Sequence, residues 1–294
     1  MNNFKIPFIF FGTPNFAIGV LDELEKNGFL PSMVVTAVDK PRGRKLIITP
    51  PEVKVWAEKR GIPVFQPKKL DDAAVQKLKS VDAELFIVAA YGKLIPKSIL
   101  EIPKHGTLNV HPSLLPRLRG ASPLSSSILT EDTTGVSILV VDEEMDHGPI
   151  IAQEEIFSWK DDLNKLPHES ILENDLAKAG GRILAEVIPK YVSGEITSKP
   201  QDDAKATFTK KINKEDGLLD LKDSAENNFR KIRAFEVWPR AYFFHETHGK
   251  KIRVIVTDAE MKNGKIVIKK LLPEGGKEIS YEEFLRRYSS ALFA

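Results

Sequence analysis

Short apolar runs alternate with polar, helix-compatible stretches throughout the first half of the chain. Residues 8–11 and 85–88 are apolar at every position, which is typical of strands that are covered on both faces of a parallel sheet. The runs predict strands at residues 6–11, 33–38, 85–90 and 107–110, and the stretches between them predict helices at residues 16–26, 51–60 and 71–79. This alternation predicts an α/β fold, with a Rossmann-like, mostly parallel sheet and helices on both of its faces.

The pattern changes after this alternation. Residues 135–142 and 149–156 have the apolar content of a strand pair that completes the sheet, and residues 164–191 read as a long helix or as a helical pair broken around Gly180-Gly181. The next residues, up to Thr209, are polar and without periodicity, which indicates a linker. We therefore predict a first domain at residues 1–193 and a linker at residues 194–209.

The C-terminal part of the chain is β-rich. Residues 251–258 and 265–272 alternate between apolar and polar side chains around an Asn263-Gly264 turn, and residues 224–235 form one amphipathic helix. Several short strands with one helix predict a second domain at residues 210–294, an OB-like β-barrel.

The chain contains no cysteine. Disulfides, thiolate zinc sites and cysteine nucleophiles are therefore excluded, so any catalysis must use oxygen and nitrogen groups. No apolar run approaches the roughly 18 residues of a membrane helix, and no signal-peptide pattern precedes the first predicted strand. A cytoplasmic location is expected.

Charge is distributed unevenly along a chain whose net charge is only +2. From Lys205 to the end there are 19 Lys and Arg residues against 13 Asp and Glu residues, whereas the remainder has 24 against 28. A basic C-terminal domain beside a mildly acidic body fits a large anionic partner, and equally fits ordinary surface solvation.

The turn after the first predicted strand has the sequence Gly12-Thr13-Pro14-Asn15-Phe16. A dinucleotide-binding fold carries G-x-G-x-x-G here, so that the backbone can approach a pyrophosphate. Only Gly12 is present, and Pro14 lacks an amide donor, so a nicotinamide or flavin dinucleotide is not expected. The chain has no P-loop motif either.

Asn109 and His111 end the fourth predicted strand. Residues two apart in a strand point to the same face, so these side chains project together at the edge of the sheet where such folds bind ligands. An amide can stabilise an oxyanion, and an imidazole can transfer a proton near neutral pH. By itself this spacing favours a structural histidine over a catalytic one.

A second polar segment, Asp142 to Gly148, lies between two predicted strands. A carboxylate at Asp146 could orient His111, as the third partner does in activated sites. The alternative is a solvated acidic turn. A serine hydrolase is disfavoured because Ser113 and Ser137 lack a G-x-S-x-G elbow, and a zinc site is disfavoured because the histidines show no H-E-x-x-H pattern.

Three motifs taken together resemble the formyltransferases that use 10-formyltetrahydrofolate. They are Asn-x-His at Asn109, Ser-Leu-Leu-Pro-x-x-Arg-Gly from Ser113, and Asp-x-Gly-x-Ile from Asp146. Further stretches are similar to the methionyl-tRNA formyltransferases, at residues 11–17, 39–44, 89–96 and 234–239. The resemblance covers nearly the whole chain. It implies transfer of a formyl group from 10-formyltetrahydrofolate to the α-amine of methionine on initiator methionyl-tRNA, for translation initiation.

The resemblance also implies roles for individual residues. Asn109, His111 and Asp146 match the catalytic residues of the family. The walls of the folate pocket match Tyr91, Gly92, Leu94, Ile95, Pro96, Ser113, Leu114, Leu115, Pro116, Val141 and Asp142. The tRNA and its aminoacyl end match Phe16, Arg42, Arg44, Lys45, Lys210, Lys211, Lys250, Lys251 and Arg253. Within the basic loop, Arg42 and Arg44 are alternatives for the principal contact.

Two alternatives remain at this point. One is a folate-dependent formyltransferase that acts on an amino sugar nucleotide or on glycinamide ribonucleotide, against which the basic loop and the C-terminal domain argue. The other is a non-catalytic RNA-binding protein, against which the complete set of Asn109, His111 and Asp146 argues. The resemblance further implies a monomer, and no metal is expected.

Overall fold

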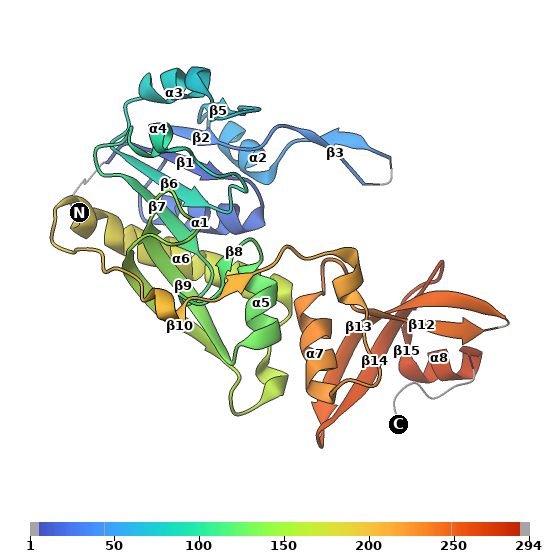
Figure 1. Cartoon of the computed structure of the whole chain (residues 1–294). Coiled ribbons are helices and arrows are strands. Elements are labelled where there is room, and N and C mark those ends of the chain that lie inside the picture. Colours follow the sequence, from blue (N-terminus) through green and yellow to red (C-terminus); the bar gives the residue numbers. More distant parts are fainter. Residues whose placement is uncertain (1–5, 44, 248, 289–294) are drawn as a thin grey trace. The chain divides into compact units, whose positions relative to one another are not determined.

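The central sheet contains seven strands within the part of the chain that the computed structural model describes, residues 6–43, 45–247 and 249–288. Its strand order is β10-β9-β7-β6-β1-β2-β5 (Figure 1). The strands are β1 (Phe8–Gly12), β2 (Met33–Val35), β5 (Val64–Phe65), β6 (Leu85–Ala89), β7 (Thr107–His111), β9 (Thr133–Val140) and β10 (Ile150–Ser158). The first five are parallel and β9 is antiparallel to β7. The predicted sheet is confirmed, including the strand pair that completes it.

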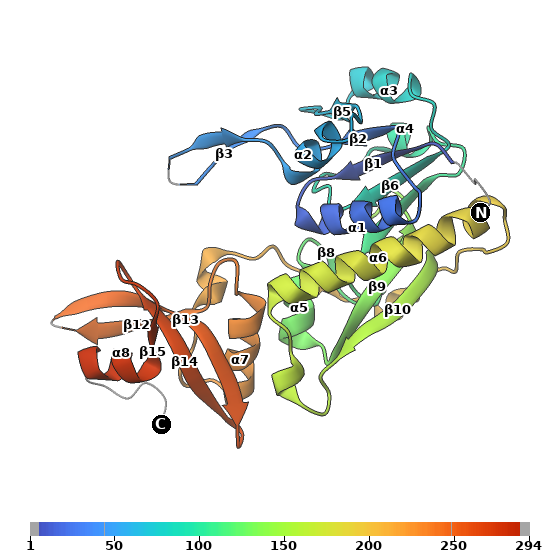
Figure 2. The same cartoon turned by 180° about the vertical axis from the view of Figure 1, so that it is seen from behind.

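Helices cover both faces of this sheet. On one face lie α1 (Asn15–Lys26) and α6 (Glu169–Val192), which Figure 2 shows in front of the strands. On the other face, α3 (Asp72–Lys79) and α4 (Lys97–Leu100) bury Val75 and Ile99 against Ile9, Phe11 and Phe86. The helix α2 (Glu52–Glu58) packs beside α1. Every residue of β1 is buried, as its continuous apolar run predicts.

The helix α6 is continuous, so the alternative of one long helix is confirmed and the alternative of a helical pair broken around Gly180 and Gly181 is wrong. A Cβ atom at Gly180 would lie 2.5 Å from Val110 Cγ1, and one at Gly181 would lie 2.8 Å from the backbone oxygen of Val20. The two glycines therefore allow β7 and α1 to approach the helix closely. They serve packing and not chain reversal.

The chain divides into two compact units, which are described separately. The first contains the residues up to Ala121 together with Gly135–Ile156 and Glu173–Phe208. The second contains Ser122–Thr134, Phe157–Leu172 and the residues from Thr209 on. Two segments from within the predicted first domain, residues 1–193, thus belong to the second unit, a grouping that no local sequence pattern indicates. The domain boundaries given above remain predictions.

The second unit contains an antiparallel sheet in the order β12-β13-β14-β15. Its strands are β12 (Tyr242–Thr247), β13 (Lys250–Lys262), β14 (Lys265–Pro273) and β15 (Ile279–Ser280), and its helices include α5 (Pro123–Thr130), α7 (Ala225–Ala234) and α8 (Tyr281–Tyr288). Asn263 and Gly264 both have positive φ, 51° and 73°, which is the geometry of a tight hairpin turn. The predicted β-rich C-terminal domain and its amphipathic helix are confirmed.

Several elements were not predicted, among them β5, β12, β15, α4, α5 and α8. A further group consists of very short elements. They are the hairpin strands β3 (Lys40–Arg42) and β4 (Ile47–Thr49), the paired strands β8 (Arg119–Gly120) and β11 (Phe208–Thr209), and the 3-10 turns η1 (Leu163–Lys165), η2 (Asp203–Lys205) and η3 (Lys214–Gly217). Each is too short to produce a periodic pattern. Among the described residues, no helix combines the length and the apolarity that crossing a membrane requires.

Candidate active site

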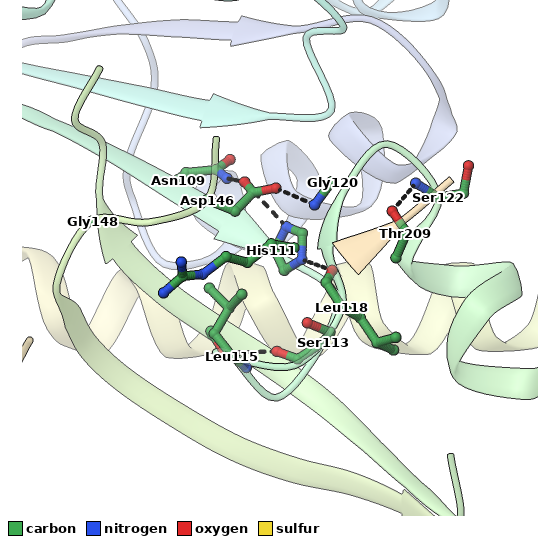
Figure 3. Close-up of polar contacts among 12 residues, drawn as sticks. Asn109, His111, Ser113, Leu115, Leu118, Gly120, Ser122, Asp146, Gly148 and Thr209 are labelled. Carbon is green, nitrogen blue, oxygen red and sulfur yellow. Dashed lines mark hydrogen bonds and ion pairs between the residues drawn. The ribbon is translucent and has the colours of Figure 1, made fainter. Parts of the chain in front are cut away.

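Asn109 and His111 lie at the end of β7, and Asp146 lies in the loop between β9 and β10. The two strands are neighbours in the sheet, with His111 paired to Ser137 of β9. Because β9 runs antiparallel to β7, the loop after β9 begins beside the amino end of β7 and folds back until Asp146 contacts Asn109 and His111. Figure 3 shows the three side chains turned toward one another. The convergence expected from the sequence is thus present in the structure.

The carboxylate of Asp146 is the centre of this group. Its Oδ1 atom lies 3.4 Å from the amide nitrogen Nδ2 of Asn109 and 3.5 Å from Nδ1 of His111. Its Oδ2 atom accepts a hydrogen bond of 2.8 Å from the backbone amide of Gly120 (Figure 3). The bond to Gly120 is short and the other two contacts are long. Asp146 is therefore anchored on one side and free to adjust toward Asn109 and His111.

His111 is buried, with 4% of its surface exposed. Its Nε2 atom lies 3.0 Å from the carbonyl oxygen of Leu118, while Nδ1 faces Asp146. Since a carbonyl oxygen only accepts, Nε2 must carry a proton in this contact. The longer contact leaves Nδ1 as the less committed nitrogen. The imidazole is thus held by the loop after β7, with one nitrogen available for exchange of partners.

Two residues that touch this group have a left-handed backbone. Leu118 has φ of 62° and Asp146 has φ of 53°. Aspartate tolerates this region better than leucine does, because its short polar side chain can make local hydrogen bonds. Such conformations cost roughly 1–3 kcal/mol and persist only where the surrounding structure enforces them. Both strained residues are held by the segment that precedes β11.

Gln201, in this segment, donates from Nε2 to the carbonyl oxygens of Asp146 and Gly148, both at 2.8 Å. Its Oε1 atom accepts from Nε and Nη2 of Arg119 at 3.1 and 2.9 Å. The Arg119 guanidinium, only 4% exposed, also donates to Asp203 at 2.7 Å. No role was predicted for Gln201, because a polar linker carries no signal for what it touches. Arg119 was noted only as the arginine of the Ser-Leu-Leu-Pro-x-x-Arg-Gly motif.

The electrostatics beside the acidic loop follow from the same contacts. The hydrogen bond from Arg119 lowers the pKa of the Asp203 carboxyl, with the positive charges of Arg119 and His147 adding to the effect. His147 lies 2.7 Å from Asp142, and this hydrogen bond raises the pKa of the imidazole. Asp142, a predicted folate residue, is therefore engaged with its own loop.

Hydrogen bonds stabilise the loop after β7. Ser113 donates to the carbonyl oxygen of Arg117, and Ser137 donates to that of Ser113, both at 2.7 Å. The backbone amide of Leu115 donates to Ser137 Oγ, and its carbonyl oxygen accepts from Gln153. Ser113 and Leu115 are 1% and 3% exposed. Their contact with folate stays a prediction. In the structure, their hydrogen bonds and their burial support the loop after β7.

The other predicted walls of the folate pocket lie on two loops. Tyr91 to Pro96 follow β6, with Leu94 exposed and Tyr91 buried against Phe11. Burial raises the pKa of Tyr91 to about 12. Lys97, at the start of α4, lies 2.8 Å from Glu143, which connects this loop to the one containing Val141. The structure therefore brings the two loops together, as a shared pocket requires.

The predicted basic loop is the β3–β4 hairpin, residues 40–49. Arg42 does not project freely, because its guanidinium is paired with the carboxylate of Glu52 in the first turn of α2. This pairing raises the pKa of Arg42 and lowers that of Glu52. Lys45 is exposed, and Arg44 lies outside the described residues. Three consecutive apolar residues of the hairpin, Leu46, Ile47 and Ile48, are each more than 60% exposed.

Phe16, predicted to lie near the aminoacyl end, has a buried ring that is 3% exposed. Its backbone amide, in the first turn of α1, donates to the Glu173 carboxylate at 3.1 Å. Burial raises the pKa of this carboxyl. A carboxylate of the chain itself thus occupies the helix N-terminus where a dinucleotide-binding fold would hold phosphate.

The C-terminal residues predicted to contact tRNA differ in exposure. Lys210, Lys211, Lys250 and Lys251 are exposed. The Lys251 ammonium lies 4.7 Å from the ring centre of Phe244. Arg253 is half-buried, stacks at 3.8 Å over the ring of Tyr242 and donates to the carbonyl oxygen of Pro239. The lysines are therefore free to meet an anionic surface, whereas Arg253 is already engaged.

No cluster of three or more side chains suited to bind a metal ion occurs among the residues that the structure describes. The polar groups around Asn109, His111 and Asp146 are an amide, an imidazole, a carboxylate and backbone donors. This set can stabilise an oxyanion and move a proton, and the adjacent loops offer backbone groups and apolar side chains to a flat ligand.

Two family models match the chain. Residues 4–188 match the model described as "Formyl transferase", and residues 211–263 match "Formyl transferase, C-terminal domain". The first match alone spans more than half of the chain.

Curated relatives agree with this match. The chain is 42% identical over 236 residues to the methionyl-tRNA formyltransferase of Halalkalibacterium halodurans, a match that covers 80% of the chain and 73% of the relative. It is 38% identical over 296 residues to that of Thermodesulfovibrio yellowstonii, covering 94% of each. The latter match therefore extends through most of both units.

Solved structures share the fold at lower identity. A methionyl-tRNA formyltransferase from Clostridium thermocellum is 20% identical with a TM-score of 0.59, covering 94% of the chain and 99% of that protein. A 4-N formyltransferase from Francisella tularensis is also 20% identical, with a TM-score of 0.64, covering 88% and 98%. At this identity, the likeness concerns the fold and does not decide the acceptor.

Proposed function

Because the chain belongs to the formyl transferase family, we propose that it transfers a formyl group from 10-formyltetrahydrofolate to the α-amine of methionine on initiator methionyl-tRNA. The observation that carries the choice of acceptor is the match over 94% of the Thermodesulfovibrio yellowstonii enzyme, which includes the C-terminal region. The product, a formylated initiator tRNA, serves translation initiation. A cytoplasmic, monomeric enzyme fits this role.

The chemistry is an acyl transfer between two nitrogen atoms. The free α-amine forms a bond to the formyl carbon, and the carbonyl electron pair moves to the oxygen. The tetrahedral intermediate then collapses as the bond between the formyl carbon and the folate nitrogen breaks. The amine loses one proton and the departing folate nitrogen gains one. An oxyanion donor and a proton carrier are therefore the two groups that the site must supply.

The side chains of Asn109, His111 and Asp146 supply both groups. The Asn109 amide donates to the oxyanion, together with a protonated His111, and His111 moves the proton between the two nitrogens. Its Nδ1 is the atom that carries this proton, because Leu118 holds Nε2 at 3.0 Å while the contact of Nδ1 with Asp146 is longer, at 3.5 Å. Asp146 orients the imidazole from 3.5 Å.

The acceptor tRNA meets two basic regions in this proposal. One is the β3–β4 hairpin, where Arg42 exchanges the Glu52 carboxylate for a phosphate of the acceptor end. The other is the exposed lysines of the second unit. Lysine and arginine side chains bind phosphates chiefly through charge, independently of base sequence. Folate is held by the loops after β6, β7 and β9.

A panel of amines tests the choice of acceptor. The protein is incubated with 10-formyltetrahydrofolate and, in separate reactions, charged initiator tRNA, an amino sugar nucleotide and glycinamide ribonucleotide. We expect formylation of the charged tRNA alone. Formylation of only a small amine would reject the tRNA acceptor and leave the acyl-transfer chemistry in place, whereas no formylation of any amine would reject both.

A further inference from the structure

We propose that residues 199–207, which we call the strap, position the Asn109–His111–Asp146 trio, with Gln201 and Thr207 as positioning residues for catalysis. The proposal rests on the function proposed above. The sequence predicts that this segment is part of a linker, residues 194–209. In the structure the strap is bonded to both of the loops that carry or hold the trio.

The strap contacts the active-site loops at successive points along its length. Lys199 forms an antiparallel bridge with Ile150, the first residue of β10. Gln201 then holds the loop that contains Asp146, and Thr207 lies against the loop after β7, where its backbone amide donates to Pro116 and its carbonyl oxygen accepts from Arg119. A segment that only connected two domains would not require bonds at each of these points.

Gln201 is bonded to the acidic loop in a way that few side chains can reproduce. Both protons of its amide nitrogen go to backbone oxygens, of Asp146 and Gly148, and its oxygen takes two donors from Arg119. A primary amide has two donors and an oxygen with two lone pairs, so every position is used. Glutamate would keep the bonds from Arg119 but would have no proton to give to the loop.

Thr207 performs the corresponding task for the loop after β7. Its Oγ1 atom accepts from the backbone amide of Leu118 at 2.8 Å. The carbonyl oxygen of the same Leu118 holds His111 at 3.0 Å. A hydroxyl on the strap is therefore one residue away from the imidazole, through a leucine whose φ of 62° needs external support.

Asp146 of the trio and Leu118, which holds His111, both have a left-handed backbone. The strap holds both of them, Asp146 through Gln201 and Leu118 through Thr207. Released from these bonds, each backbone would relax toward its ordinary region and move the attached group. A displacement of about 1 Å in a catalytic group can cost on the order of 100-fold in rate. Loss of the strap contacts should therefore lower kcat more than it lowers substrate binding.

The test compares Gln201→Glu with Gln76→Glu, which makes the same change at an exposed position on α3. Initial rates are measured with the full chain and with whichever amine the wild-type protein formylates, so that a wrong acceptor does not affect the comparison. We expect Gln201→Glu to lower kcat about 10- to 100-fold while each KM changes less than about threefold. Thermal unfolding, followed by circular dichroism, should match that of Gln76→Glu.

A second pair isolates the hydroxyl. Thr207→Val removes the acceptor for Leu118, and Thr209→Val removes an acceptor of the same kind two residues later, where Thr209 Oγ1 receives the Ser122 amide at 3.1 Å (Figure 3). Thr207→Val should lower kcat about 10-fold, and Thr209→Val should leave it within about twofold of wild type. Equal effects of the two variants would contradict the assignment of Thr207.

The pathway through Asp146 is tested by combining variants. In an Asp146→Asn background, single-turnover rates with and without Gln201→Glu should differ by less than about threefold, because the effect of Gln201 passes through a group that is already impaired. Full multiplicative losses would overturn the proposal. So would a Gln201→Glu variant that unfolds more readily but retains wild-type kcat, since that result describes a purely structural contact.

Discussion

Asn109 is the residue whose chemical role can be separated best from its role in folding. Among the residues that the structure describes, its side chain has one hydrogen-bond partner, Asp146 at 3.4 Å, so its removal should change the free energy of unfolding by about 1 kcal/mol or less. As an oxyanion donor, it should matter far more to the rate. We expect Asn109→Ala to lower kcat about 10²- to 10³-fold, measured as formylation under saturating substrates.

The control for this variant is Asn174→Ala, which removes an exposed amide from α6 whose bond is to its neighbour Asp175. Its kcat should equal that of the wild type. Near-normal transfer by Asn109→Ala would withdraw the oxyanion role from this residue. The two-residue spacing alone predicts that Asn109 and His111 lie on one face of a strand. Their partner Asp146 comes from another loop, and that spacing does not predict it.

At the scale of elements, the close contact between α6 and β7 connects packing to the site. Alanine at Gly180 would gain helix propensity of about 1 kcal/mol, yet its Cβ would lie 2.5 Å from Val110, between Asn109 and His111 on β7. Overpacking costs about 1–3 kcal/mol. We expect Gly180→Ala to lower both the free energy of unfolding, measured in urea, and kcat.

Gly181→Ala is the matched variant. Its Cβ would meet the backbone of Val20 in α1 at 2.8 Å, and it does not approach β7. It should therefore lower the stability by a comparable amount and leave kcat of the folded protein unchanged. If both variants lowered kcat equally, the loss would reflect general loosening and not displacement of β7.

For the whole molecule, the uneven charge predicts different salt dependence for the two substrates. Each phosphate contact contributes a slope of about −0.9 to the plot of log K against log salt concentration for duplex nucleic acid. Binding of initiator tRNA should therefore weaken steeply with salt, while binding of folate changes little. Lys250→Gln combined with Lys251→Gln should reduce the tRNA slope by about two, measured by fluorescence titration.

Lys265→Gln combined with Lys277→Gln provides the control, since it removes the same charge from exposed positions outside the predicted set. The salt dependence of its tRNA binding should be steeper than that of the Lys250 and Lys251 variant. A tRNA affinity that is independent of salt in the wild type would remove the second unit from acceptor binding altogether.

The amino-acid sequence predicts the layered α/β fold, the absence of a dinucleotide-binding turn and the position of Asn109 and His111 on one face of a strand. Each of these follows from local rules: continuous apolar runs, a missing glycine pattern and the two-residue period of a strand. The family resemblance then identified Asp146 as the third partner. The structure confirmed the mostly parallel sheet that the sequence predicts.

The groups that hold these residues in place come from distant parts of the chain and are seen only in the three-dimensional contacts. Gln201 and Thr207 lie in a polar stretch without periodicity, and a side-chain hydrogen bond to a remote carbonyl leaves no local pattern. Likewise, the sequence at Gly180 and Gly181 is compatible with a break in the helix, because the segments that pack against them cannot be recognised in it. The sequence also suggests that Arg42 is a free cation, whereas the structure pairs it with Glu52. Periodicity reports an element and the face it buries, whereas contacts between elements depend on the three-dimensional path of the chain.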